Sequence, residues 1–172
     1  MLHVVADTTE MDSKQIQSIL VAAINHCEAD VVLCGKQAAD TNSGSTGPGI
    51  ASLMGAACVG MVSEVAVEGD GFSALRASSM GNERVSVSRP CLFAFDKAST
   101  ELRRPNVKGI MMAKRKVIET VSTDDLGIDL GESQVNIDSH DSPPEKPPGQ
   151  KFEGADSVQT VVLKLREEAN VI

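Results

Sequence analysis

Apolar positions in the first third of the chain alternate between the spacing of strands and the spacing of helices. Short apolar runs at 2–6, 31–34 and 57–62 predict strands, and the 31–34 run is apolar on both faces, as a central parallel strand must be. Apolar residues recur at helical intervals over 13–28, and a second helix is expected around Pro48, which suits a first helical turn. Strands that alternate with helices in this way predict an α/β fold with a parallel sheet.

The pattern changes after residue 62. Two polar turns, Glu68–Gly71 and Met80–Glu83, separate short alternating strands and predict β-hairpins over 63–89. One further apolar strand is expected at 91–95. The hairpins should therefore form a β-structured flap appended to the parallel core.

The last third of the chain predicts less packed structure. A long loop with a basic segment is expected over 96–116, followed by a strand at 117–121. Residues 122–150 are acidic, have few large apolar side chains and end in a proline-rich run, which is typical of an extended arm. A terminal helix over 156–169 carries an apolar stripe, so it needs a docking surface on its own domain or on a partner.

Composition narrows the classes of function. The 172 residues carry a formal net charge of −8, which argues against a general nucleic-acid binder and against binding to anionic membranes. Trp and Tyr are absent, so aromatic platforms for stacking a base or a flavin are few. The four cysteines and three histidines lack zinc-ligand spacing, and no apolar run approaches the roughly 18 residues that span a membrane. No catalytic triad is visible, which makes a hydrolase or transferase the least favoured class.

The stretch from Gly35 to Pro48 carries the candidate binding chemistry. It follows the carboxyl end of a parallel strand, where open α/β sheets bind ligands. Its glycines let the backbone approach a phosphate, its polar side chains add donors, and the next helix supplies N–H groups. The stretch is neither a Walker loop nor a GxGxxG motif, so composition alone leaves an ordinary Gly/Ser turn equally open.

Two blocks of sequence resemble the β subunit of electron-transfer flavoproteins. DVVLCGKQAADTNSGSTGP resembles the family's nucleotide-binding signature, and RRPNVKGIMMAKRKVIE resembles its segment between the last core strand and the C-terminal arm. The order of the expected elements also fits, and the resemblance covers residues 2–172.

The resemblance implies a three-layer α/β/α parallel sheet of the adenine-nucleotide-binding type. It implies a heterodimer with one FAD, held mainly by the α subunit, and a structural AMP in the β subunit. Such a dimer takes electrons from acyl-CoA dehydrogenases during fatty acid β-oxidation and passes them to a quinone oxidoreductase. The β subunit is then an electron carrier without catalytic residues of its own, in the mitochondrial matrix or in a bacterial cytoplasm.

By position, the resemblance also assigns residues to two surfaces. The AMP-binding turn comprises Gln37, Ala38, Ala39, Asp40, Thr41, Asn42, Ser43, Gly44, Ser45, Thr46, Gly47 and Pro48. The expected phosphate-side and ribose-side contacts among them are Asp40, Asn42, Ser45, Thr46 and Gly47. Asp40 should take a hydroxyl or cap the turn, because a carboxylate repels a phosphate.

The second surface docks electron-donating partners, with Val107 as an apolar anchor smaller than the leucine common in the family. Its expected members are Arg103, Arg104, Val107, Lys108, Ile110, Met111, Lys114 and Arg115.

The expected domain division is a partial nucleotide-binding domain over 1–121 and an arm with a terminal helix over 122–172. The family's domain begins with further strands and helices, so we expect this chain to be truncated at its N-terminus and to bind AMP weakly alone. Two other functions stay open at this point. One is a stand-alone nucleotide-binding module of the universal-stress type, and the other is an interaction subunit without a nucleotide.

Overall fold

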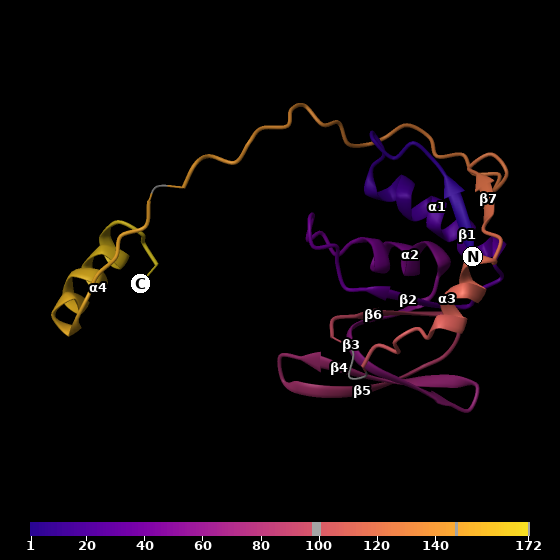
Figure 1. Cartoon of the computed structure of the whole chain (residues 1–172), viewed down its shortest axis with the longest axis horizontal. Helices are drawn as coiled ribbons and strands as arrows, with labels where there is room; N and C mark the ends of the chain where they lie inside the picture. The colour runs from indigo at the N-terminus through magenta and orange to yellow at the C-terminus, as the bar shows by residue number, and fades with distance from the viewer. Residues whose placement is uncertain (98–100, 147, 172) are drawn as a thin grey trace. The chain divides into compact units, whose positions relative to one another are not determined.

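The structure is a computed structural model that describes residues 1–97, 101–146 and 148–171 (Figure 1). It contains two compact units, Met1–Ile137 and Asp138–Ile172. The expected boundary at residue 121 stays a prediction, since compactness alone does not define a folding domain. Residues 98–100 of the expected 96–116 loop and Pro147 of the proline-rich run lie outside the described residues.

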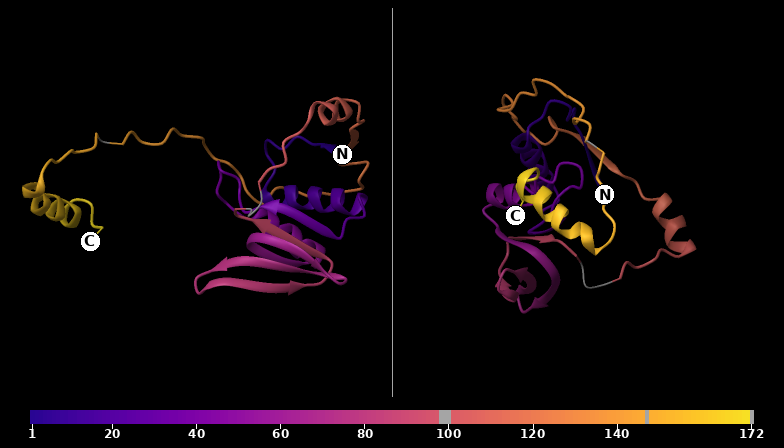
Figure 2. Two further views of the ribbon diagram at one scale, coloured as in Figure 1. Left: turned by 60° about the horizontal axis from the view of Figure 1, so that its bottom comes forward. Right: turned by 90° about the vertical axis from the view of Figure 1, so that its left-hand side faces the viewer.

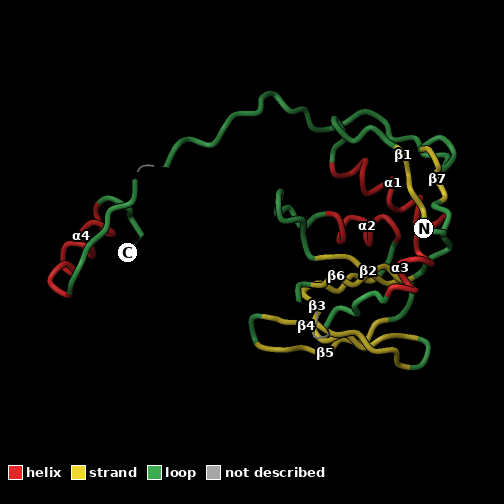
Figure 3. The backbone as a smooth tube through the Cα atoms, viewed as in Figure 1, coloured by secondary structure: helices red, strands yellow, loops and turns green. Residues whose placement is uncertain are grey.

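The main sheet of the first unit has five strands in the order β2-β6-β3-β4-β5 (Figure 3). Its parallel part joins β2 (Val31–Gly35), β6 (Cys91–Phe95) and β3 (Ala57–Glu68). An antiparallel meander continues it through β4 (Gly71–Ser78) and β5 (Gly81–Val87). The expected α/β fold with a parallel sheet is therefore confirmed.

The expected central position of the 31–34 strand is wrong. Within the described part of the chain β2 pairs only with β6, so it is an edge strand, and Leu33 is 64% exposed. The strand β1 (Leu2–Val5) lies outside this sheet and pairs in parallel with β7 (Glu119–Ser122). An apolar run on both faces shows how strongly its side chains favour burial, but it does not show how many strands flank it.

The helix α2 (Thr46–Met54) covers one face of the parallel strands, and α1 (Ser13–His26) packs against α2. Buried Ile50 and Ala51 of α2 pack on Leu92 and Ala94 of β6. A buried side chain of the size of Ile or Leu contributes about 1.5–3 kcal/mol, so this contact holds the start of α2 near the strand ends. Pro48 lies in the first turn of α2, as expected, and the helix ends at Gly55, whose φ is +62°.

The opposite face of the sheet packs against its own antiparallel extension. Val62, Phe72 and Phe93 belong to one buried cluster, and the two phenylalanine rings meet edge to face at 5.7 Å. The strand β3 shifts its register on both partners between Val59 and Glu64, around Met61 with a φ of +59°. This irregularity lies where β3 passes from parallel to antiparallel pairing.

The region expected as a continuous loop over 96–116 contains a helix, α3 (Val107–Lys114). Its start is stabilised by Asn106, whose side-chain oxygen accepts a hydrogen bond of 2.7 Å from the N–H of Gly109. Val107, Ile110 and Met111 of α3 do recur at helical spacing, but the helix is only eight residues long, which is too short for that pattern to predict a helix.

The second unit consists of an extended segment, a 3-10 turn at Ala155–Ser157 and the helix α4 (Val158–Glu167), drawn in yellow in Figure 2. No residue of α4 is buried, and Val158 is 58% exposed. Across the ranges that the structure describes, every helix is too short or too polar to cross a membrane.

Candidate functional site

A small cavity lies at the carboxyl end of β2, where the chain turns toward α2. The turn starts beside β6, because the N–H of Lys36 donates a 2.8 Å hydrogen bond to the carbonyl of Phe95. The cavity has a volume of about 280 Å³. Its lining comes from the end of β2, the turn and the first residues of α2, and comprises Cys34, Gly35, Lys36, Gln37, Ala38, Thr41, Ser43, Gly44, Thr46 and Gly47.

Hydrogen bonds inside the turn fix its shape. The N–H of Asn42 donates to the carbonyl of Ala38 at 3.0 Å, and the Gln37 amide donates to the Asn42 side-chain oxygen at 2.9 Å. Asp40 accepts a 2.8 Å hydrogen bond from the N–H of the next residue, Thr41. Hydrogen bonds among its own polar groups therefore organise the turn.

The first residues of α2, Thr46 and Gly47, line the cavity. The N-cap residue of α2, Ser45, makes no side-chain hydrogen bond to the helix, so the first-turn amides of Thr46 and Gly47 are not capped by that side chain. Gln17 of α1 holds the Ser45 carbonyl through its side-chain amide at 3.1 Å. Amides at the positive end of a helix are a favourable place for an anion such as a phosphate.

Gly47 brings α2 close to the sheet. A Cβ on Gly47 would lie 2.9 Å from the Sγ of Cys34 and 3.5 Å from the Cδ2 of Leu92. Burial, with a smaller contribution from Cys58, raises the pKa of the Cys34 thiol. Cys34 therefore acts as a packing residue under the turn, since a thiol that stays protonated is a poor nucleophile.

One lysine carries the charge of the cavity lining, and a carboxylate outside the lining pairs with it. Lys36 is the only charged residue among the described residues that line the cavity, and its Nζ lies 2.7 Å from the Oδ1 of Asp96. Elsewhere in the described ranges, no group of three or more His, Cys, Asp or Glu side chains could hold a metal ion. The site can thus offer backbone amides, hydroxyls and one neutralised lysine to a ligand.

The structure brings most of the sequence-predicted AMP-site residues to this cavity. Those that line it are Gln37, Ala38, Thr41, Ser43, Gly44, Thr46 and Gly47. Those outside the lining are Ala39, Asp40, Asn42, Ser45 and Pro48, which shape the turn or the start of α2. Their role in nucleotide binding stays a prediction.

Sequence reasoning did not assign Lys36 or Asp96 to the site. Lys36 stands inside the signature stretch, but Asp96 lies 60 positions further along the chain. Their proximity follows from the pairing of β2 with β6, which places the two strand ends side by side.

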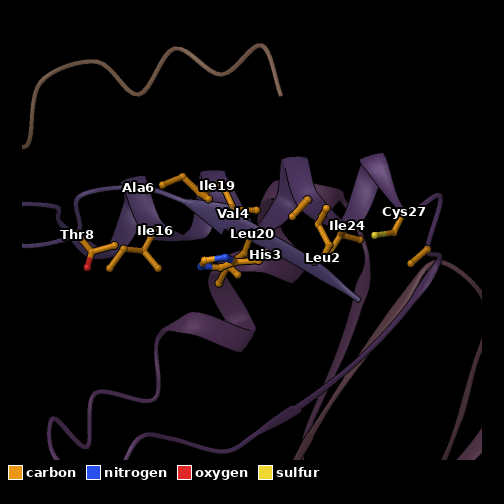
Figure 4. A pocket seen from close by; sticks show the side chains of 12 residues that line it. Leu2, His3, Val4, Ala6, Thr8, Ile16, Ile19, Leu20, Ile24 and Cys27 are labelled. Carbon is orange, nitrogen blue, oxygen red and sulfur yellow. The ribbon is translucent and has the colours of Figure 1, made fainter. Parts of the chain in front are cut away.

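A larger, apolar groove lies between β1 and α1 (Figure 4). Its volume is about 530 Å³, and aliphatic side chains such as Leu2, Val4, Ile16, Leu20 and Ile24 dominate its lining. Such a surface suits apolar packing and offers little to a phosphate. The polar cavity beside α2 is therefore the better candidate for a nucleotide.

The expected partner-docking residues are brought together on a surface away from the cavity lining. Val107, Lys108, Ile110, Met111 and Lys114 lie on α3, Arg115 caps its C-terminus, and Arg103 and Arg104 precede it. All eight are exposed, and Val107 is 75% exposed. Docking itself stays a prediction.

Comparison with known proteins finds one family whose matched range contains both sequence blocks, DVVLCGKQAADTNSGSTGP and RRPNVKGIMMAKRKVIE. Residues 2–126 match the electron transfer flavoprotein domain. The chain is 28% identical to the electron transfer flavoprotein subunit beta of Bacillus subtilis, over all of this chain and 68% of the bacterial one. It is 30% identical to the protein of the same name from Bos taurus and 31% identical to that from Sus scrofa, over 94% of this chain and 62% of each relative.

Proposed function

The chain belongs to the electron transfer flavoprotein family, among its β subunits, and we propose that it works in a heterodimer with an α subunit that holds most of an FAD. The observation that carries this proposal is the match to the family domain over residues 2–126. Members of the family are electron carriers. The chain spans about two thirds of the length of its relatives, so the activity of the whole assembly belongs to the proposal.

We propose that the cavity beside α2 holds the AMP. Its volume of about 280 Å³ is at the small end of ligand sites, which suits the phosphate and ribose of a mononucleotide better than a whole dinucleotide. The amides of Thr46 and Gly47 would bind the phosphate, and the hydroxyls of Thr41 and Ser43 would bind the ribose or phosphate oxygens. The AMP would add its binding energy to the stability of the folded protein, with no redox chemistry of its own.

The fold proposed for this function is the adenine-nucleotide-binding type of α/β domain. In it, the meander of β3, β4 and β5 acts as a flap beside the nucleotide domain. This assignment is supported by the position of the cavity, because ligands of open α/β sheets bind at the carboxyl ends of parallel strands.

We propose acyl-CoA dehydrogenases as electron donors and a quinone oxidoreductase as acceptor. The exposed cations and apolar side chains of α3 would contact a donor through an acidic patch and an apolar pocket. The corresponding location is the mitochondrial matrix, or the cytoplasm of a bacterium.

Co-expression with a candidate α subunit tests the proposal. We expect the two chains to copurify with a flavin absorption spectrum, and chromatography of the acid-denatured supernatant to release FAD and AMP in equal amounts. A complex with flavin but no nucleotide would favour an interaction subunit, and a chain that binds AMP but never an α subunit would favour a stand-alone module.

A further inference from the structure

We propose that Asp96 makes the cavity selective for a nucleoside monophosphate, because it neutralises the lysine that would otherwise attract further phosphates. This inference rests on the proposed nucleotide function. It assigns a specificity-determining role to the Lys36–Asp96 ion pair.

The ion pair is built into the ends of two neighbouring strands. Lys36 directly follows β2 and Asp96 directly follows β6. Backbone hydrogen bonds hold both residues, from the Lys36 N–H to the Phe95 carbonyl at 2.8 Å and from the Asp96 N–H to the Val62 carbonyl at 3.2 Å. The sheet therefore places the two residues side by side, their side chains meet at an Nζ–Oδ1 distance of 2.7 Å, and each side chain is less than half exposed.

The positive charge available to a ligand is small. The N-terminal end of a helix acts as roughly half of a positive charge, which suits a single phosphate. A second or third phosphate would bring additional negative charge, and Lys36 is the only charged side chain among the described lining residues. As long as Lys36 is paired with Asp96, that extra charge meets a neutral pair and not a cation.

The carboxylate of Asp96 is the source of this neutrality. Asp96 does not line the cavity, but its Oδ1 lies 2.7 Å from the Nζ of Lys36, which does, so its negative charge cancels the attraction that the lysine would exert on a further anion. In phosphate-binding loops that hold nucleoside triphosphates, an unneutralised lysine reaches the outer phosphates. Replacing Asp96 by a neutral residue should give Lys36 that role.

The test measures the binding of AMP, ADP and ATP by calorimetry, without magnesium and at low salt, to the full chain in its α-subunit complex after removal of bound nucleotide. In the unmodified protein we expect AMP to bind about tenfold more tightly than ATP. Asp96→Asn should strengthen ATP binding about five- to tenfold and AMP binding about twofold, so the preference shrinks or reverses.

Three controls separate this effect from a general change of charge or of folding. In Lys36→Gln/Asp96→Asn the gain for ATP should vanish, because no lysine is released. Asp30→Asn makes the same change of net charge at the other end of β2, where Asp30 pairs with Arg89, and should leave all three affinities unchanged. If Asp96→Asn does not fold, Asp96→Ser replaces it.

The outcomes distinguish the two proposals. If none of the three nucleotides binds the unmodified protein, the proposed function fails and this inference fails with it. If AMP binds but Asp96→Asn leaves the ratio of AMP to ATP affinity unchanged, the inference is overturned while the proposed function stands. A gain for ATP that persists in the double variant would also overturn it.

Discussion

Gly47 is the residue whose replacement should disturb the cavity most directly. The closest atom to a Cβ at this position would be the Cys34 Sγ, at 2.9 Å, and behind it lies buried Leu92. Gly47→Val should therefore push the start of α2 away from β2 and cost about 1–3 kcal/mol of unfolding free energy, as overpacked cores do. Urea unfolding of the purified protein measures this loss.

Two further variants test whether the clash is the cause. Gly47→Val/Cys34→Ala should recover part of the lost stability, because the sulfur that the new side chain meets is removed. Gly35→Ala lies in the same lining but has no atom within 4 Å of its Cβ, so it should leave stability nearly unchanged. Equal losses for Gly47→Val and Gly35→Ala would contradict the steric explanation.

At the residue scale, the sequence predicts which stretch forms the cavity but not the roles of its side chains. Local chemistry shows that Gly44, Ser43 and Thr46 stand between a strand and a helix, and all three line the cavity. The role of Asp96 depends on strand order, which is set by pairing between residues far apart in sequence. A single sequence contains no direct signal of such pairing, because period and composition are local properties.

At the element scale, the start of α1 also holds a distant segment of the chain. Asp12 caps α1 by accepting from the N–H of Gln15 at 2.9 Å, and its other oxygen accepts from the N–H of Gln134 at 2.8 Å. Gln15 adds a 3.0 Å hydrogen bond to the carbonyl of Gly131. The N-cap thus anchors residues 131–134 of the first unit.

This contact should make the anchoring of 131–134 dependent on pH. The hydrogen bonds from Gln15 and then from Gln134 lower the pKa of Asp12 below its ordinary value of 3.8. Because the pKa is lower in the folded than in the unfolded chain, the carboxylate stabilises the fold above pH 3.8, and this contribution is lost as the pH falls through the folded pKa. Asp12→Asn keeps an N-cap but has one oxygen fewer, so it should be less stable than wild type at neutral pH.

Thermal melts across pH measure the difference. The gap in melting temperature between wild type and Asp12→Asn should be largest near neutral pH and should close below pH 3.8. The protection of the Gln134 amide from hydrogen exchange, relative to its intrinsic rate at each pH, should fall over the same range in wild type only. Two parallel melting profiles would show that Asp12 has no such role.

Elements with a packed face are predicted better than elements without one. The capping-box pair Asp12 and Gln15 and the apolar period behind it predict α1, because that helix packs on its neighbours. The helix α3 buries nothing and is only eight residues long, so its apolar spacing was too short to predict a helix. The edge position of β2 was missed because a strand's neighbours are a property of the whole sheet.

At the scale of the whole molecule, the distribution of charge is uneven. The chain has a net charge of −8, yet six of its 16 lysines and arginines lie within 103–116, a stretch that contains no acidic residue. All of these cations are exposed. The sequence alone shows this contrast, because charge content does not depend on the fold. The placement of the cations on and beside the helix α3 is visible only in the structure.

This basic segment, 103–116, should steer the protein toward the proposed electron donors. Lys114→Glu/Arg115→Glu should slow electron transfer from an acyl-CoA dehydrogenase by about tenfold at low salt, because steering toward an acidic patch is lost. The rate should also lose most of its dependence on ionic strength, since salt screens the attraction that the variant no longer has. Stopped-flow reduction of the flavin in the α/β complex measures both effects.

Lys146→Glu/Lys151→Glu changes the net charge equally at exposed positions of the second unit, and it should leave the rate unchanged. If both double variants slowed the reaction equally, net charge and not the α3 segment would govern the encounter.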